Sequence, residues 1–361
     1  MRKLNLKELD YKLNQIPFIV KCNPFSLAFL ENIEIISNLK EFIYEIDSLK
    51  KTNCRRYAII DYLQSEYTRF PLAELLDDPF QPNASEILFN KYTQLQNLIF
   101  NQKQISKYIT SNTKYDVIFL ILVDGLSYEN CKGRENVYPC FVNGATITEV
   151  GFKNIIGNPP IAYRLYKKYF INRFGFSYWN RENNISNTIF EMFDKNTQMF
   201  QVSEFDEVVT ILKKNSLNKT FVQILISGLD EMCHRNWDRP PIEAIVNRIF
   251  ENYIPSLKEL ILSKNLSAML YLISDHGIWW KPKINSQEKY IVLNDKRGQS
   301  KRFFSGHLIH DKVKHVTCYN KNYSLLKYPY ILRSFKKNEW GCHGGISYYE
   351  SIVPFLKMEV Y

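Results

Sequence analysis

Three runs of almost uninterrupted apolar residues dominate the hydrophobic pattern of the chain. They are Val117–Val123, Phe221–Ile226 and Met269–Ile273, and longer helical or irregular stretches separate them. Strands that are covered on both faces have this composition, whereas strands with one face in water alternate apolar and polar residues. The pattern from about residue 115 onward therefore predicts an α/β fold with a mostly parallel sheet flanked by helices.

Residues 1–112 are predicted to be helical instead. The segment Leu27–Leu49 carries apolar residues at helical spacing. The segment Asn83–Glu86 resembles a capping box that opens a second helix. We therefore expect an N-terminal helical accessory region over 1–112, followed by a sheet domain over 113–361.

The segment 281–337 interrupts the sheet domain with irregular, basic sequence. It holds about fourteen lysines and arginines and about three acids, in a chain whose formal net charge is +10. We expect it to form an inserted cap. Such a surface favours polyanionic partners, although a lysine-rich, solvated exterior explains the same composition equally well.

The cysteines and the hydropathy indicate the compartment. Seven cysteines are scattered along the 361 residues without CxxC spacing, which favours reduced thiols. The start of the chain has no apolar leader, and no run approaches the roughly 18 apolar residues that a membrane span needs. We expect a soluble, cytoplasmic protein that makes no membrane contact.

Acidic and imidazole side chains follow each predicted strand at the point where it ends. Asp124 follows the first strand, Asp230 and His234 follow the second, and Asp275 and His276 follow the third. The carboxyl ends of parallel strands meet at one edge of a sheet, where ligands bind. Each motif alone has a structural explanation, as a turn, a helix-surface pair or a strand cap. Three such coincidences at one edge favour a shared site.

A late glycine turn adds a third imidazole. His343 stands directly before Gly344 and Gly345, and Ser347 and Glu350 form a predicted capping box after them. With the strand-end residues, His343 completes a set of three carboxylates and three imidazoles. This set is large enough to hold two divalent metals.

A nucleophile is predicted before the segment 149–157. Thr146 and Thr148 both precede this potential helix, whose free backbone N–H groups suit phosphate oxygens. Either threonine could instead be an ordinary helix cap.

These motifs, in this order, resemble the alkaline phosphatase superfamily and, within it, the PglZ domain. The segment His343–Pro354 is similar to the PglZ signature of His-Gly-Gly followed by Ser, Glu and Val-Pro. The segment that begins with Thr148-Glu-Val-Gly resembles the Ser-Glu-Val-Gly-His segment of metal-dependent phosphoglycerate mutases, which favours Thr148 over Thr146 as the nucleophile. The resemblance covers about Val117 to Pro354, and it implies that 113–361 is an alkaline-phosphatase-like catalytic domain.

The resemblance implies a metal-dependent phosphoesterase. One metal would be held by Asp124, Asp275 and His276 beside Thr148, and the other by Asp230, His234 and His343. Zinc suits this mixture of ligands best, and manganese and magnesium are alternatives. The expected reaction passes through a phosphothreonine intermediate.

The predicted substrate is a nucleotide or oligonucleotide, cleaved by a phosphodiesterase. This hypothesis rests on the basic cap and its aromatic residues, which could stack on bases or form the core of the cap itself. Asn154, Arg164 and His307 are candidate substrate contacts by position. Resemblance to PglZ proteins also implies a role in prokaryotic anti-phage defence, with other defence proteins as partners.

Three alternatives stay open. The chain could be a PglZ-type scaffold that binds nucleic acid or proteins with little catalysis, or it could be a phosphomonoesterase. Cys233, His234, Cys342 and His343 could instead form a structural zinc site, although helix geometry points Cys233 and Asp230 to different faces.

Overall fold

The computed structural model describes residues 18–19, 34–36, 57–59, 81–98, 100–111, 113–156, 169–177, 197–236, 238–283, 289–295 and 300–361. The chain divides into two compact units, Met1–Phe100 and Asn101–Tyr361. No described helix has both the length and the hydropathy needed to cross a membrane.

The smaller unit contains both strands and helices. Strands β1 (Phe18–Ile19), β3 (Tyr57–Ile59) and β2 (Glu34–Ile36) form a parallel sheet in that order. Helices α5 (Gln81–Asn90) and α6 (Tyr92–Leu98) follow, and α5 confirms the helix expected near Asn83.

The helix predicted over Leu27–Leu49 is wrong at residues 34–36, which form β2 and pair with β3. The rest of that segment lies outside the described residues. Short apolar runs rich in isoleucine satisfy both the helical and the strand period, and a β-branched side chain favours the strand. Pairing with β3 is a non-local interaction that the periodicity does not contain.

A seven-stranded sheet forms the centre of the larger unit, in the order β5-β17-β9-β4-β8-β6-β7. Its strands are β4 (Val117–Val123), β5 (Val137–Phe141), β6 (Phe170–Ser177), β7 (Thr197–Gln201), β8 (Thr220–Ser227), β9 (Ala268–Ser274) and β17 (Ile352–Val360). Strands β9, β4, β8, β6 and β7 run parallel, and β17 is antiparallel to both of its neighbours. The predicted mostly parallel α/β fold is therefore confirmed, and the three predicted strands lie side by side as β9-β4-β8.

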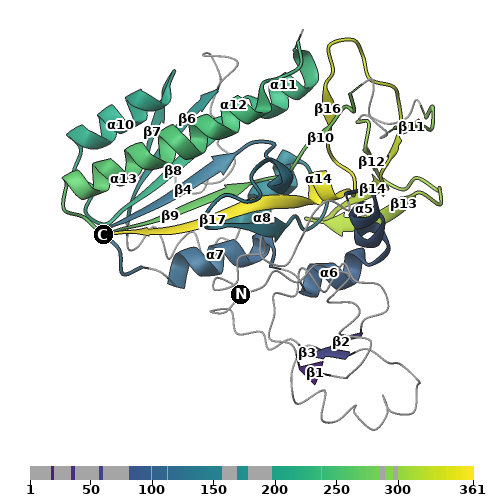
Figure 1. Ribbon diagram of the computed structural model, residues 1–361, viewed down its shortest axis with the longest axis horizontal. Coiled ribbons are helices and arrows are strands. Elements are labelled where there is room, and N and C mark those ends of the chain that lie inside the picture. The colour runs from purple at the N-terminus through teal and green to yellow at the C-terminus, as the bar shows by residue number, and fades with distance from the viewer. Residues whose placement is uncertain are drawn as a thin grey trace. The chain divides into compact units, whose positions relative to one another are not determined.

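Helices cover both faces of this sheet, as Figure 1 shows. Helices α10 (Phe205–Lys214) and α13 (Ile254–Ser263) lie on one face, and α7 (Gln102–Ser111) and α8 (Thr148–Ile156) lie on the other. Every residue of β4 and β9 is buried as a result, which explains their continuous apolar sequence. Helix α7 belongs to this unit, although the sequence placed residues 102–111 in the N-terminal region.

The remaining helical segments connect the strands. They are η2 (Tyr128–Asn130), α11 (Leu229–Arg235), α12 (Ile242–Asn247), the π-helical segment η4 (Arg248–Tyr253) and α14 (Tyr348–Ser351).

The basic insertion forms small sheets of its own. Its strands are β11 (Ile291–Val292), β12 (Phe303–Ser305), β13 (Val313–Cys318), β14 (Lys321–Leu326) and β15 (Tyr330–Ile331), which form the sheets β11-β15 and β12-β14-β13. Directly outside it, β10 (Trp279–Trp280) pairs with β16 (Gly341–Cys342). This pair brings the two ends of the insertion together (Figure 1).

Candidate metal centre

The ends of the three central strands lie at one level of the sheet. Val123 at the end of β4 is opposite Ile226 of β8 and Ser274 of β9. The next residues along β4 and β9 are Asp124 and Asp275, so these two carboxylates emerge side by side. Helix α11 begins directly after β8 and brings Asp230 to the same edge.

The first ligand group consists of Asp124, Asp275 and His276. The His276 Nε2 atom lies 3.6 Å from Asp124 Oδ1 and 3.5 Å from Asp275 Oδ2. Asp275 and His276 have no exposed surface. The other oxygen of Asp275 accepts hydrogen bonds from the backbone N–H of Gly125 (3.1 Å) and of His276 (2.9 Å), which fixes the carboxylate with Oδ2 toward the imidazole.

The second ligand group consists of Asp230, His234 and His343. The Asp230 Oδ1 atom lies 3.0 Å from His343 Nε2 and 3.4 Å from His234 Nε2, and the two Nε2 atoms are 3.2 Å apart. The four-residue spacing on α11 therefore places Asp230 and His234 on one helix face, as predicted. The rings of His276 and His343 stack at 4.1 Å, so the two groups are adjacent.

Three carboxylate oxygens in the two groups lack a hydrogen-bond partner among the described residues, although each is buried. They are Asp124 Oδ1, Asp230 Oδ1 and Asp275 Oδ2. Buried acceptors without donors are costly unless a cation satisfies them. Ligand atoms of Asp124, Asp275 and His276 lie within 4.8 Å of one another, as do those of Asp230, His276 and His343. The donor set and the unsatisfied oxygens fit two divalent metals.

The pKa values of two of these acids shift in opposite directions. Burial raises the pKa of Asp124 well above its usual value, and the neighbouring Asp275 and Asp230 carboxylates add to this effect. For Asp230, burial also acts to raise the pKa, but the His343 and His234 rings outweigh it, and the pKa falls well below the usual value. Negative charge is thus concentrated and only partly compensated, as a cation site requires.

The pKa values of two imidazoles also shift in opposite directions. Burial lowers the pKa of His276, although nearby Asp275 opposes this, so the ring favours the neutral form that binds metals. Burial also acts to lower the pKa of His343, but its contact with Asp230 outweighs burial and raises that pKa to about 9.

Thr148 and Thr146 have different hydrogen-bond partners. The Thr148 Oγ1 atom, in the first residue of α8, lies 3.3 Å from His276 Nε2 at the first ligand group. The Thr146 hydroxyl is buried, donates to the carbonyl of Gly345 (2.9 Å) and accepts from the N–H of Gly344 (2.9 Å). Of the two candidates, Thr148 alone therefore presents its hydroxyl to the metal ligands, and Thr146 fixes the glycine turn.

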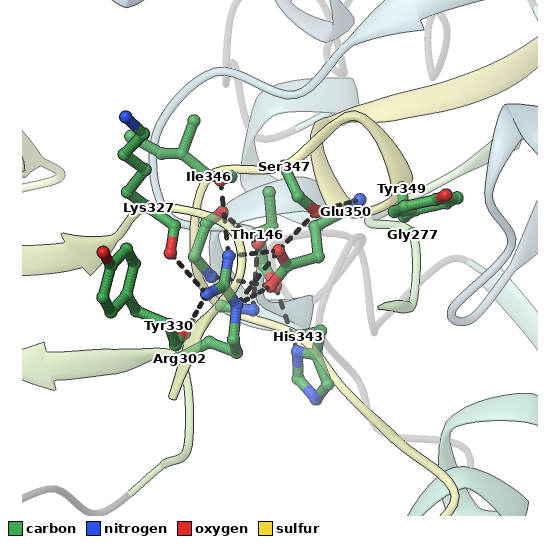
Figure 2. A network of polar contacts seen from close by, with 12 residues as sticks. Thr146, Gly277, Arg302, Lys327, Tyr330, His343, Ile346, Ser347, Tyr349 and Glu350 are labelled. Atoms are coloured by element: carbon green, nitrogen blue, oxygen red, sulfur yellow. Dashed lines mark hydrogen bonds and ion pairs between the residues drawn. The ribbon is translucent and has the colours of Figure 1, made fainter. Parts of the chain in front are cut away.

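A buried polar network contacts His343 on the Nδ1 side of its ring, as Figure 2 shows. The Nδ1 atom of His343 bonds the carbonyl of Thr146 (3.0 Å), so Nε2 faces Asp230. The predicted capping box is present, because Ser347 Oγ accepts the N–H of Glu350 (3.1 Å). Glu350 Oε1 also accepts the N–H of Gly345 (3.0 Å), which joins the glycine turn to the start of α14.

Arg302 completes this network, and no sequence signal points to it beyond its place in a basic segment. Its guanidinium binds both oxygens of Glu350, at 2.7 to 3.1 Å, and neither residue has exposed surface. It also donates to the carbonyls of Lys327, Tyr330 and Ile346. The insertion is thereby anchored to the turn that carries His343 (Figure 2).

A cavity of about 380 Å³ opens beside Thr148. His234 and His343 line it together with residues of the insertion and the segment after it, namely Ser300, Lys301, Phe303, Arg333 and Glu339. Lys301 and Glu339 form a nearly buried ion pair at 2.6 Å. The insertion therefore supplies one wall of the cavity at the predicted nucleophile.

Two of the candidate substrate contacts, Asn154 and His307, are not among the residues that line this cavity. Asn154 is buried, and its side chain bonds the carbonyl of Asn143 (2.7 Å) and the side chains of Gln102 (3.0 Å) and Tyr319 (2.8 Å). These contacts indicate a structural role for Asn154, and a contact with substrate stays a prediction. His307 is exposed, its ring lies 5.0 Å from that of His315, and it is not among the residues that line the cavity. Arg164 lies outside the described residues.

The aromatic residues of the insertion mostly pack against one another. Tyr290 and Tyr328 belong to one apolar cluster with Trp279, and Phe304 and Tyr330 pack on another around Leu308. Tyr323 is buried and contacts Phe303 edge to face. Of these aromatic residues, Phe303 lines the cavity at Thr148.

The structural zinc alternative is not supported. Cys233 and Cys342 are buried, and burial raises the pKa of both thiols. Neither belongs to the groups of described residues that are close enough together to hold an ion.

No protein-family model matches the chain, and no curated protein sequence matches it. Solved structures similar to it include murine ectonucleotide pyrophosphatase/phosphodiesterase 5, with 11% identity over 66% of this chain and 87% of that one, at a TM-score of 0.43. Phosphonoacetate hydrolase from Sinorhizobium meliloti has 11% identity over 67% of this chain and 90% of that one, also at 0.43. The C-terminal periplasmic domain of EcEptC from Escherichia coli has 13% identity over 46% and 66%, at 0.30.

Proposed function

We propose that the chain is a two-metal phosphoesterase of the alkaline phosphatase superfamily, of the PglZ type. One observation carries this proposal: three buried carboxylate oxygens that lack hydrogen-bond partners among the described residues lie with three imidazoles in two adjacent groups, and the Thr148 hydroxyl lies 3.3 Å from His276 Nε2 of the first group. Purely structural acids would be satisfied by donors, and a non-catalytic metal site has no need of a hydroxyl at a helix start.

Asp124, Asp275 and His276 would hold one metal. Asp230, His234 and His343 would hold the other, and the two groups meet where the rings of His276 and His343 stack. Zinc suits these oxygen and nitrogen donors best. When bound, a divalent metal lowers the pKa of a nearby hydroxyl and stabilises charge on phosphoryl oxygens.

The residues of the chain then perform a double displacement. Thr148 Oγ1 gives its proton to solvent water and attacks phosphorus, so that the Oγ–P bond forms while the P–O bond to the leaving group breaks. The leaving oxygen takes the electron pair of that bond and a proton from solvent. Water then attacks the phosphorus of the phosphothreonine and loses a proton, the P–Oγ bond breaks, and Oγ1 takes its electron pair and a proton, which regenerates the Thr148 hydroxyl. His276, fixed by its Nδ1 contact with the carbonyl of Gly277 (3.1 Å), keeps Nε2 toward the nucleophile.

The proposed substrate is a nucleotide or oligonucleotide phosphodiester. Arg333, the ion pair of Lys301 with Glu339 and the ring of Phe303 line the cavity at Thr148. A guanidinium and an aromatic ring together suit a phosphate and a base. The free cysteines among the described residues support a cytoplasmic location. A role in anti-phage defence, with other defence proteins as partners, is proposed from the resemblance to PglZ alone.

The test is hydrolysis of bis-p-nitrophenyl phosphate by protein stripped with EDTA and then supplied with zinc or manganese. We expect activity that depends on the metal and is lost in Thr148→Ala by about a thousandfold or more, the scale of removing a covalent nucleophile. Thr148→Ser is the matched control, because it keeps a hydroxyl at the same position.

The outcomes separate the alternatives. Activity on p-nitrophenyl phosphate but not on the diester would assign the chain to the phosphomonoesterases. Zinc binding without either activity, unchanged by Thr148→Ala, would support the scaffold and refute the proposed reaction.

A further inference from the structure

A second cavity, of about 250 Å³, lies at the same edge of the sheet. Ser127 and Ile278, which line it, stand three residues after Asp124 and two residues after His276. It shares no lining residue with the cavity at Thr148. The β10–β16 pair separates the two cavities: Trp279 lines the second cavity, and its cross-strand partner Cys342 lines the first.

The lining of the second cavity is cationic. Arg239, Lys281 and Lys283 contribute to it, and the backbone carbonyl of Lys281 accepts a hydrogen bond from Arg239 Nη1 (3.0 Å). Among the described lining residues, Glu129 is the one carboxylate, and it pairs with Lys132 at 2.7 Å. The charge balance of this cavity therefore favours an anionic ligand.

Three polar groups in the lining have buried atoms without a hydrogen-bond partner among the described residues. Trp279 Nε1 and Trp280 Nε1 are unused donors, and Asn130 Oδ1 is an unused acceptor. A complete ligand must therefore both accept and donate hydrogen bonds. Inorganic phosphate is mainly an acceptor, whereas a nucleotide offers phosphate oxygens together with the N–H groups of its base. The Trp280 ring also provides a face on which a base can stack.

We propose that the second cavity binds a nucleotide of a single-stranded nucleic acid whose scissile phosphate lies at Thr148. This inference rests on the proposed function and narrows its substrate class to oligonucleotides. Because cross-strand residues are only about 5 Å apart, the β10–β16 pair leaves the two cavities close enough for one short strand to enter both.

The test compares Arg239→Ala/Lys283→Ala with the wild type in binding a fluorescent single-stranded oligonucleotide, followed by anisotropy between about 50 and 200 mM salt. Each phosphate contact on a single strand contributes a slope of about −0.7 to the dependence of log affinity on log salt. We expect the variant to bind about tenfold or more weakly at low salt, with a slope shallower by about 0.7 to 1.4.

The matched control is Lys213→Ala/Lys214→Ala, which removes the same charge from exposed positions at the end of α10. It should leave the salt slope unchanged. Hydrolysis of bis-p-nitrophenyl phosphate, which is too small to span both cavities, should be equal in the wild type and both variants. This activity also reports that Arg239→Ala/Lys283→Ala is folded.

Equal oligonucleotide affinity and slope in the wild type and in Arg239→Ala/Lys283→Ala would overturn the inference. Calorimetry with inorganic phosphate provides a second arm: if the variant loses phosphate binding but keeps oligonucleotide binding, the cavity belongs to a free anion and the inference is wrong. Absence of diester hydrolysis in the wild type would refute the proposed function instead, so the two failures are distinguishable.

A second variant, Trp280→Phe, removes one of the two unused N–H groups while it keeps an aromatic ring and the charge. We expect oligonucleotide affinity to fall about three- to tenfold, within the range for losing one typical hydrogen bond, with the salt slope unchanged. Unchanged affinity would contradict the role of Trp280.

Discussion

The first ligand group extends directly from the sheet, whereas the second is assembled from a short helix and a turn. Asp124 and Asp275 follow adjacent parallel strands, and Asp275 and His276 are fully buried. In the second group, the side chain of His234 on α11 is 35% exposed, and His343 depends on contacts with distant segments. The sheet places the acids of the first group side by side, whereas His343 of the second group reaches its place only through hydrogen bonds with distant segments.

Different hydrogen bonds therefore hold the ligands of the two proposed metals in place. Buried amides hold the first group: Gln102 Nε2 donates to the carbonyls of Ser274 (2.9 Å) and Asp275 (2.7 Å). The buried ion pair of Arg302 and Glu350 holds the second, through the glycine turn. Changes to one support should therefore affect one metal more than the other.

The largest effect is expected from Asp275→Asn. An asparagine can still accept the backbone hydrogen bonds that Asp275 Oδ1 receives, but its other atom becomes an amide nitrogen that cannot bind a metal. We expect loss of the first metal and a fall in diester hydrolysis of about a thousandfold or more, since a metal contributes several kcal/mol to such reactions. Metal content by mass spectrometry and kcat measure the two effects.

Asp116→Asn is the control for this variant, because Asp116 lies at the opposite end of β4, where it bonds Ser267. It should keep both metals. Two metals per chain in Asp275→Asn would contradict the ligand assignment.

An intermediate effect is expected from Glu350→Gln, which breaks the support of the second group. A buried guanidinium left without its partner costs about 3–5 kcal/mol of unfolding free energy. The affinity for the second metal should fall about 10–100-fold, the usual range for the loss of a partner that orients a ligand. The affinity for the first metal should change much less. Urea denaturation and metal titration measure these changes.

The double variant Arg302→Met/Glu350→Leu separates stability from positioning. It removes both buried charges, so much of the unfolding free energy should return. Leucine offers no acceptor to the N–H of Gly345, so the second metal should stay weakly bound. Recovery of full metal affinity would show that Glu350 does not position His343.

The same contrast explains how much of the molecule the sequence predicts. Continuous apolar runs identify β4, β8 and β9, and their ends identify Asp124 and Asp275, because both signals are local. The i, i+4 spacing likewise identifies Asp230 and His234. The expected helix at Leu27–Leu49 failed at β2 because strand pairing is decided by a distant segment.

The supports of the site are invisible to sequence patterns for the same reason. Arg302 bonds a glutamate 48 residues away, and Gln102 bonds a backbone 172 residues away. Neither residue stands in a motif, and each looks like an ordinary surface residue in its local sequence. Asn154 was selected by its place near Thr148, but its direction inside α8 could be known only from the packing of the helix.

The smallest effect, and the finest test of the comparison, is expected from Asn154→Ala. Asn154 donates to Gln102, which in turn donates to the backbone carbonyl of Asp275, so it links α8 to the first ligand group. Gly151 of the same helix also lies against this backbone: an added Cβ would be 2.0 Å from the carbonyl oxygen of Asp275. Loss of these bonds should cost about 1–3 kcal/mol of unfolding free energy. Because the contacts of Asn154 orient the helix, we expect kcat to fall by about tenfold with KM unchanged. The control is Lys153→Ala at the neighbouring position, which removes an exposed ion pair with Glu149. It should alter neither kcat nor KM and change the unfolding free energy by at most about 0.5 kcal/mol.

A rise in KM at constant kcat in Asn154→Ala would instead identify Asn154 as a substrate contact, and the first group would then be held by the sheet without help from α8.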